Sequence, residues 1–168
     1  PLHFWRKTAG PDGDPWALGA ERAARDTGNF SFSNAWLAEI DGEVGACLLG
    51  YAADEVPGPI DPDTPPIFVP LLQLEALAPG SWYLNVLATY EAFRGKGLGS
   101  ALLAHAETVA AAAGHDSISL IAADTHQDAL RLYRAKGYRE VARRPVVKDD
   151  WQVAASEWIL FVKPTRSA

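Results

Sequence analysis

Apolar residues along the chain change between strand-like and helix-like spacing, most regularly in the second half. Residues 82–89 and 118–123 are short and almost wholly apolar, as is typical of strands buried on both faces. Between them, five apolar residues recur at helical spacing, starting in the turn before residues 100–113: Leu98, Leu102, Ala106, Val109 and Ala113. The pattern therefore predicts a β-α-β unit, whose helix ends at Gly114.

The first half of the chain follows a different pattern. Residues 1–15 are rich in Gly, Pro and Asp and predict a loop, and residues 16–26 predict a helix. The runs 35–40 and 44–52 are strand-like, and Asp41-Gly42 between them is a strong signal for a two-residue hairpin turn. We therefore expect an antiparallel pair near the front of the chain.

The remaining segments lie between the first hairpin and the β-α-β unit and near the end of the chain. Residues 54–70 contain six prolines and predict a loop, after which 71–77 predict a helical turn or two. Near the end of the chain, 138–147 and 157–162 predict a pair of strands.

A helix is predicted between residue 125 and Gly137. Thr125 and Asp128 resemble a capping box at its start, and Gly137 stands where a left-handed C-cap belongs. One face of this helix carries four residues: Ala129, Leu132, Tyr133 and Lys136. Together the elements predict an α/β (α+β) fold, in which helices flank a mixed, mostly antiparallel sheet with one β-α-β unit.

Composition narrows the class of protein. The 168 residues suggest a single domain spanning 1–168, and 48% hydrophobic with 21% charged residues is ordinary for a globular protein. The net charge of −6 argues against a nucleic-acid partner and leaves room for a cationic substrate. Cys47 is the only cysteine, which indicates a reducing compartment. Without a signal peptide or an apolar run near 18 residues, we expect a cytoplasmic protein with no membrane partner.

The chemistry-bearing segment is Arg94-Gly95-Lys96-Gly97-Leu98-Gly99, between the strand over 82–89 and the following helix. Glycines without Cβ atoms let backbone N–H groups close around an anion, and the helix start adds partial positive charge. The segment therefore predicts a phosphate site. A dinucleotide fingerprint requires GxGxxG and a P-loop requires GxxxxGK followed by Ser or Thr, and neither spacing is present.

The arrangement Arg-x-x-Gly-x-Gly resembles the pyrophosphate loop of the GNAT acetyltransferase family. A second pattern supports the resemblance: the family's later helix commonly contains Asn-x-x-Ala-x-x-Leu-Tyr-x-x-x-Gly-Phe. Here the same spacing joins His126, Ala129, Leu132-Tyr133 and Gly137-Tyr138. The resemblance covers about 82–163 and implies transfer of an acetyl group from acetyl-CoA to an amine of a small molecule or a protein, with no metal.

The resemblance also assigns roles to residues. It implies that the coenzyme is bound by backbone groups of 87–89, by the loop and by the later helix, through the following residues: Leu87, Ala88, Thr89, Arg94, Gly95, Lys96, Gly97, Leu98, Gly99, Ser100, His126, Ala129 and Tyr133. The backbone N–H of Leu87 would hold the oxyanion, and Tyr133 would donate a proton to the departing thiolate. Taken alone, Tyr133 also fits a core tyrosine. The central strands offer only Asn85 as a candidate contact for the acceptor, and we expect it to lie there.

No residue is an obvious general base. Asp124, Glu91 and His126 stand near the expected site without convincing positions, so the acceptor is a low-pKa amine or the base comes from another carboxylate. Three such carboxylates are available: Glu39, Glu55 and Glu75.

The chain departs from the family pattern in two places. His126 replaces the usual Asn, and only 34 residues, with one predicted helix, precede Ala35 where the family has a strand and one or two helices. The sequence begins at Pro1 and contains no Met, so we expect preceding residues to be missing. A non-catalytic acyl-CoA sensor or scaffold of the same fold is the alternative function. Nucleotide-dependent phosphoryl transfer lacks a Mg²⁺-binding carboxylate motif. The oligomeric state stays open, a homodimer included.

Overall fold

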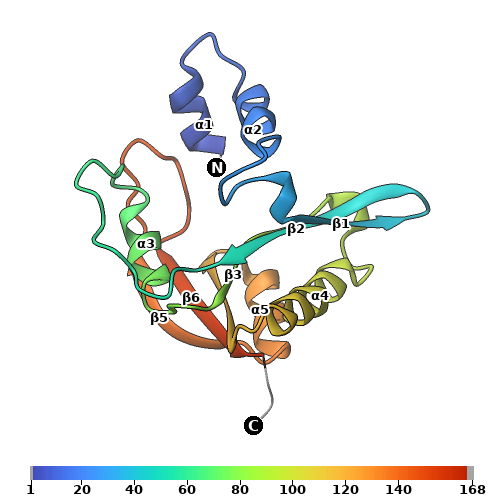
Figure 1. The fold of residues 1–168 in the computed structure, drawn as a ribbon. Helices are drawn as coiled ribbons and strands as arrows, with labels where there is room; N and C mark the ends of the chain where they lie inside the picture. Colours follow the sequence, from blue (N-terminus) through green and yellow to red (C-terminus); the bar gives the residue numbers. More distant parts are fainter. Residues whose placement is uncertain (1, 166–168) are drawn as a thin grey trace.

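A computed structural model describes residues 2–165. One six-stranded sheet runs through the molecule in the order β1-β2-β3-β4-β6-β5 (Figure 1). Its strands are β1 (Ala35–Ile40), β2 (Glu43–Ala52), β3 (Trp82–Thr89), β4 (Ser117–Ala123), β5 (Arg139–Pro145) and β6 (Glu157–Pro164). The β3–β4 pair is parallel and every other neighbouring pair is antiparallel, which confirms the predicted mixed sheet with one β-α-β unit.

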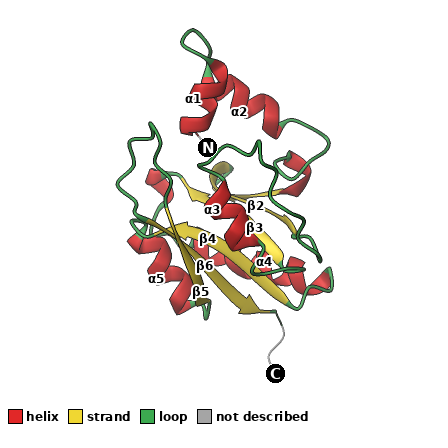
Figure 2. Ribbon diagram, turned by 90° about the vertical axis from the view of Figure 1, so that its left-hand side faces the viewer, coloured by secondary structure: helices red, strands yellow, loops and turns green. Residues whose placement is uncertain are grey.

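Helices cover both faces of this sheet (Figure 2). The helices are α1 (Leu2–Ala9), α2 (Pro15–Ala23), α3 (Val69–Glu75), α4 (Leu98–Ala112) and α5 (Gln127–Ala135), with short 3₁₀ turns η1 (Phe32–Asn34) and η2 (Glu91–Phe93). Side chains of α4 and α5 pack with Leu84, Leu120 and Phe161, whereas Leu74 of α3 packs with Leu160. Because adjacent residues of a strand point to opposite faces, α3 lies across the sheet from α4 and α5.

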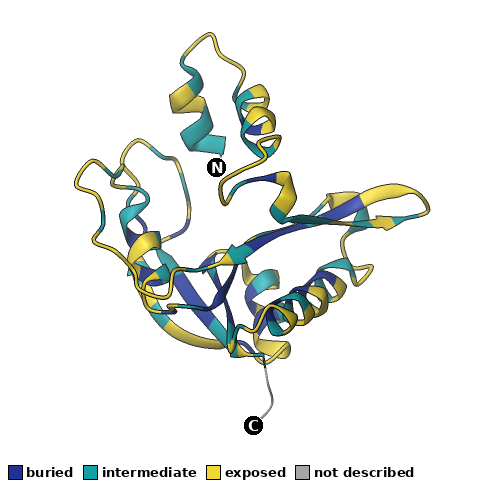
Figure 3. Ribbon diagram, in the orientation of Figure 1, coloured by how far each residue is buried: buried dark blue, intermediate teal, exposed yellow. Residues whose placement is uncertain are grey.

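The first hairpin forms as the sequence predicts. Asp41 and Gly42 both have positive φ, 54° and 81°, as a two-residue turn between twisted strands requires. The buried core follows the central strands and the inner side of α4, whereas the N-terminal helices are mostly exposed or half-buried (Figure 3).

The prediction of a loop over residues 1–15 is wrong in its first part. Leu2–Ala9 form α1, and the loop is confined to the turn that follows, where Gly10 has a φ of 76°. The indole of Trp5 packs over Gly19 of α2, and the ring of Phe4 meets that of Phe68 edge-on at 4.9 Å. These tertiary contacts stabilise a helix too short to form alone. Two helices, not one, therefore precede β1.

Candidate active site

The β3 and β4 strands part in the middle of the sheet. They pair only from Trp82–Ile118 to Leu84–Leu120. Beyond Leu84, β3 continues to Thr89 in contact with β2, and β4 continues to Ala123 in contact with β6. Residues 86–89 therefore have a strand partner on their β2 side and a diverging neighbour on the other. We call this opening the fork.

A β-bulge lies at the start of the fork. Leu84 pairs with Gly50 and Val86 with Leu49, so Asn85 is an extra residue in β3. The bulge shifts the alternation of the strand: Trp82 and Leu84 pack in the α4-side core, and after the bulge Leu87 does so. Asn85 is exposed, and its amide Nδ2 donates to the Tyr51 hydroxyl at 3.1 Å.

The glycine-rich loop begins where β3 leaves the sheet. The N–H of Tyr90 donates to the carbonyl of Gly45 at 2.9 Å, which ties the loop to β2. The Phe93 ring packs against Gly45, and the Lys96 ammonium stands 4.8 Å from the centre of that ring. This anchoring fixes the loop at the mouth of the fork.

Backbone conformation leaves the loop open toward solvent. Gly95 and Gly97 have φ values of 76° and 84°, and no atom lies within 4 Å of the place that a Cβ would take at either residue. Gly97 is the N-cap of α4, and no side chain caps the helix there. The first turn of α4 therefore presents uncapped N–H groups beside the exposed side chains of Arg94 and Lys96.

The predicted coenzyme residues after the loop lie in the first turn of α4. Leu98, Gly99 and Ser100 are all half-buried. A Cβ at Gly99 would stand 3.4 Å from a methyl group of Leu132, so the absence of a side chain lets α5 approach α4 closely. The structure thus places both sequence motifs next to each other.

The start of α5 differs from the prediction. His126, not Thr125, is its N-cap, and no side chain forms a capping bond there, so the predicted Thr125–Asp128 capping box is wrong. The Asp128 carboxylate instead pairs with Arg131, and Gln127 donates from its side chain to the Asp124 carbonyl at 2.6 Å. His126 itself is exposed at the entrance of the helix.

Tyr133 lies deeper on α5, and its side chain is 7% exposed. Its ring is 6.0 Å from the rings of both Tyr138 and Phe161, and Ala129 packs against the same core. Burial raises the pKa of Tyr133 to about 12, so the phenol keeps its proton at neutral pH. The packing role and the proposed acid role are compatible.

The candidate bases occupy different surroundings. Glu39 is exposed on β1, and Asp124 accepts the N–H of Ser156 at 3.0 Å. Glu75 is partly buried at the end of α3, and burial raises the pKa of its carboxylate to about 7. Sequence reasoning did not foresee that the Tyr51 hydroxyl accepts from the Asn85 amide, because Tyr51 belongs to an apolar strand pattern and stands near no motif.

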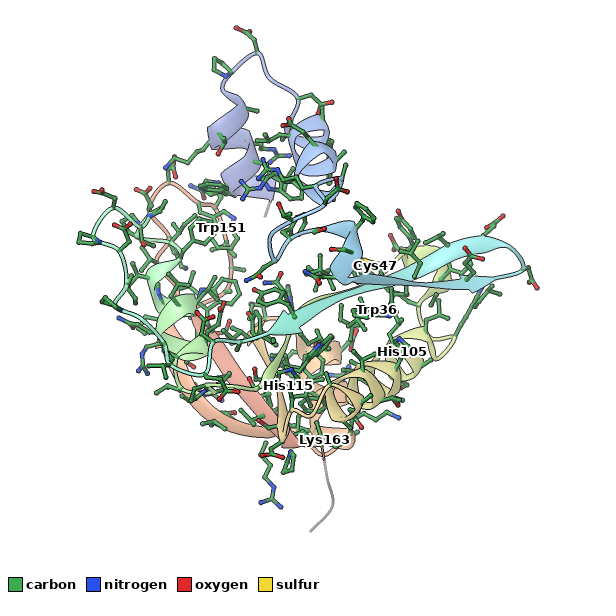
Figure 4. All side chains as sticks on the ribbon, viewed as in Figure 1. Trp36, Cys47, His105, His115, Trp151 and Lys163 are labelled. Atoms are coloured by element: carbon green, nitrogen blue, oxygen red, sulfur yellow. The ribbon has the colours of Figure 1, made fainter. Side chains whose placement is uncertain are left out.

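Aromatic side chains cluster in two separate places. The Trp36 ring lies 5.7 Å from that of His105 and 5.9 Å from that of Trp82, on the α4 side. Trp151 lies well away from them, toward α1, where it stacks on His3 at 5.6 Å (Figure 4). Two surface hollows of about 490 and 260 Å³ border α1, and neither is lined by a predicted site residue.

A family model described as the acetyltransferase (GNAT) family matches residues 3–138. The chain belongs to this family. No curated protein matches the sequence significantly. The fold itself is found in many solved structures.

Three solved structures illustrate the likeness. One, described as an acetyltransferase, is 23% identical with a TM-score of 0.65, over 98% of this chain and 89% of that one. A GNAT family acetyltransferase from Elizabethkingia anophelis with acetyl-CoA bound is 17% identical with a TM-score of 0.56, over 79% and 78%. An N-acetyltransferase from Staphylococcus aureus is 14% identical with a TM-score of 0.59, over 87% and 79%. At these low sequence identities, the similarity to the three structures shows a shared fold and nothing more specific.

Two kinds of feature are absent from the part of the chain that the structure describes. Within residues 2–165, no helix combines the length and apolar character needed to cross a membrane. The same residues contain no group of three or more His, Cys, Asp or Glu side chains placed to hold a metal ion.

Proposed function

We propose that this GNAT protein transfers an acetyl group from acetyl-CoA to a primary amine by direct attack, without a metal. One observation carries the proposal: the fork between β3 and β4 opens directly beside the uncapped, glycine-rich start of α4. The fork offers an unpaired strand edge to an extended amide-rich arm, and the loop offers N–H groups and cations to a diphosphate.

The residues fit the coenzyme in three places. The amides of Gly95–Ser100, with Arg94 and Lys96, would hold the pyrophosphate, and the free edge of Leu87–Thr89 would bind the pantetheine arm. The N–H of Leu87 would stabilise negative charge on the thioester oxygen. When bound, the coenzyme supplies an acyl carbon with a thiolate leaving group, and Tyr133 would donate the proton that the sulfur needs.

Release of free CoA thiol tests this function against the alternative of a binding module. Acetyl-CoA affinity is measured by calorimetry, and thiol release is followed with a panel of primary amines. We expect micromolar-range binding and amine-dependent thiol release. Binding without thiol release from any amine would favour the sensor or scaffold, and an absence of binding would overturn both functions.

A further inference from the structure

We propose that Asp124 is a positioning residue, which holds the β4 side of the fork away from β3 so that the pantetheine arm of the coenzyme can enter. The inference rests on the proposed use of acetyl-CoA and gives Asp124 a role other than that of a base. It is carried by the hydrogen bonds that join the side chain and the backbone of Asp124 to the start of β6.

The β3 side of the fork has hydrogen-bonding groups that a neighbouring strand could use. Among residues 2–165, the fork-side edge of β3 beyond Leu84 has no strand partner. The N–H of Tyr90 donates to the Gly45 carbonyl in β2, and N–H groups alternate in direction along a strand, so those of Leu87 and Thr89 point into the fork. If β4 lay beside this edge it would pair with it, so an open fork requires that β4 is held elsewhere.

Asp124 stands level with the stretch of β3 that is expected to bind the arm. Leu84 lies opposite Leu120 in the paired part of the two strands, and four residues further along each strand this register brings Asp124 level with Ala88. An extended arm between the two edges needs about two strand spacings, roughly 10 Å, whereas direct pairing needs only about 4.8 Å. The position of Asp124 therefore controls whether the arm has room.

Both the backbone and the side chain of Asp124 bind the start of β6, which lies on the side of β4 away from β3. The N–H of Asp124 donates to the Glu157 carbonyl at 3.0 Å and continues the β4–β6 ladder beyond the Ala123–Trp158 pair. Both carboxylate oxygens accept the N–H of Ser156, at 3.0 and 3.2 Å. A hydrogen bond to an ionised acceptor is stronger than one between neutral groups, so the end of β4 is held firmly toward β6.

The partner of the carboxylate is itself fixed in place. The Ser156 carbonyl accepts the N–H of Val146 at 2.9 Å, so the connection reaches the residue after β5. Ala155, next to Ser156, is fully buried in an apolar cluster with Ala123 and Val146. A movement of Asp124 toward β3 would therefore also separate packed apolar side chains, which a close-packed cluster resists.

Asp124 also fixes the start of α5. The side chain of Gln127 donates to the Asp124 carbonyl at 2.6 Å, and the N–H of His126 donates to the Ala123 carbonyl at 3.1 Å. The same helix carries Tyr133, the proposed acid. A displaced Asp124 would change the width of the fork first and the position of that phenol with it.

The decisive experiment separates binding of the arm from binding of the diphosphate. Calorimetry measures the affinity for acetyl-CoA and for phospho-ADP, the fragment of the coenzyme without the arm, and acetyl-CoA should bind the parent more tightly. Asp124→Ala should lose about tenfold or more in affinity for acetyl-CoA, the effect of one hydrogen bond to a charged group, and keep its affinity for phospho-ADP within about twofold. Asp124→Asn, which keeps one acceptor oxygen, should retain most of the acetyl-CoA affinity. Asp116→Ala, which removes an exposed carboxylate at the opposite end of β4, is the matched control and should bind both ligands like the parent.

Hydrogen exchange of the parent keeps the inference testable if Asp124→Ala fails to fold. The amides of Asp124 and Ser156 should exchange slowly with and without ligand, because their hydrogen bonds exist before the coenzyme binds. The amides of Leu87 and Thr89 should become slow with acetyl-CoA and not with phospho-ADP.

Three results would overturn the inference and leave the proposed function standing. They are fast exchange of the Ser156 amide in the unliganded parent, an unchanged affinity of Asp124→Ala for acetyl-CoA, and an equal loss of affinity for both ligands in that variant. A parent that binds acetyl-CoA no more tightly than phospho-ADP, or not at all, overturns the proposed function as well.

Discussion

At the scale of single residues, Gly97 does two things that a side chain would oppose. Its φ of 84° is strained for an L-residue, and its open side faces the solvent at the mouth of the fork. Gly114, at the other end of α4, has nearly the same φ of 85° and equally open surroundings. Substitutions at these two glycines can therefore be compared to separate the effect of backbone strain from the effect on ligand binding.

Gly97→Ala should weaken acetyl-CoA binding at least tenfold, because the strained residue re-orients the N–H groups at the start of α4. Gly114→Ala carries a similar conformational cost, about 1–2 kcal/mol, and should leave binding unchanged. Calorimetric titration with acetyl-CoA and urea unfolding measure the two effects. Equal loss of affinity in both variants would mean that the loop acts through stability alone.

Tyr133→Phe should lower kcat by about 10²-fold or more and leave acetyl-CoA affinity within twofold, because the phenol is needed only as the sulfur departs. Since the pKa of Tyr133 is about 12, the parent should show no loss of rate from this group up to pH 10. Tyr138→Phe, whose ring lies 6.0 Å away in the same core, is the control. A parent-like kcat in Tyr133→Phe would leave this tyrosine a packing role only.

At the scale of elements, the close contact of β2 and β3 depends on a missing side chain. A Cβ at Gly50 would stand 2.0 Å from the indole of Trp82, which is 4% exposed and packed in the core. Gly50→Ala must therefore displace the ring or the strand just where the bulge begins. We expect a loss of about 1–3 kcal/mol in the free energy of unfolding, the usual cost of overpacking.

Urea unfolding checks this expectation. Gly58→Ala is the matched control, because its φ is not in the left-handed region and no atom lies within 4 Å of the added methyl group. It should change stability by less than about 0.5 kcal/mol. Equal stabilities of the two variants would show that Trp82 moves freely.

Sequence patterns predicted the individual helices and strands better than the way these elements pair and pack. The hairpin turn, the strands of the β-α-β unit and the glycine-rich loop each carry local signals, and the structure confirms them. The fork carries no such local signal. Periodicity describes each strand separately and cannot predict that the pairing of β3 with β4 stops at Leu84. Helix α1 was missed for a similar reason: Trp5 and Phe4 stabilise it through tertiary contacts with Gly19 of the next helix and with the distant Phe68. The contact between the Tyr51 and Tyr83 rings joins two strands, so no single sequence window contains it.

At the scale of the whole molecule, the two faces of the sheet have different tasks. The α4–α5 face carries both family motifs and the large core that holds Tyr133. The α3 face carries Glu75, a partly buried carboxylate whose pKa is raised by burial and by the Asp54 carboxylate. The fork connects the two faces, so in the proposed function an acyl group bound from one side would meet an amine held on the other.

Burial of Glu75 should make the stability of the whole protein depend on pH. Its pKa is about 7 in the folded state against an ordinary 4.5, so the folded protein holds this proton more tightly than the unfolded chain does. Its stabilising contribution is complete below pH 4.5 and is lost as the pH rises to 7, by about 3 kcal/mol for a shift of this size. Glu75→Gln cannot lose a proton there. We expect its free energy of unfolding, relative to the parent, to increase by that amount between pH 4.5 and 7.5, as measured by urea unfolding at each pH. Glu43→Gln, which alters an exposed carboxylate at the start of β2, is the control for the removal of a carboxylate at the surface. A difference between Glu75→Gln and the parent that stays constant with pH would mean that the Glu75 carboxylate is as well hydrated in the folded protein as in the unfolded chain.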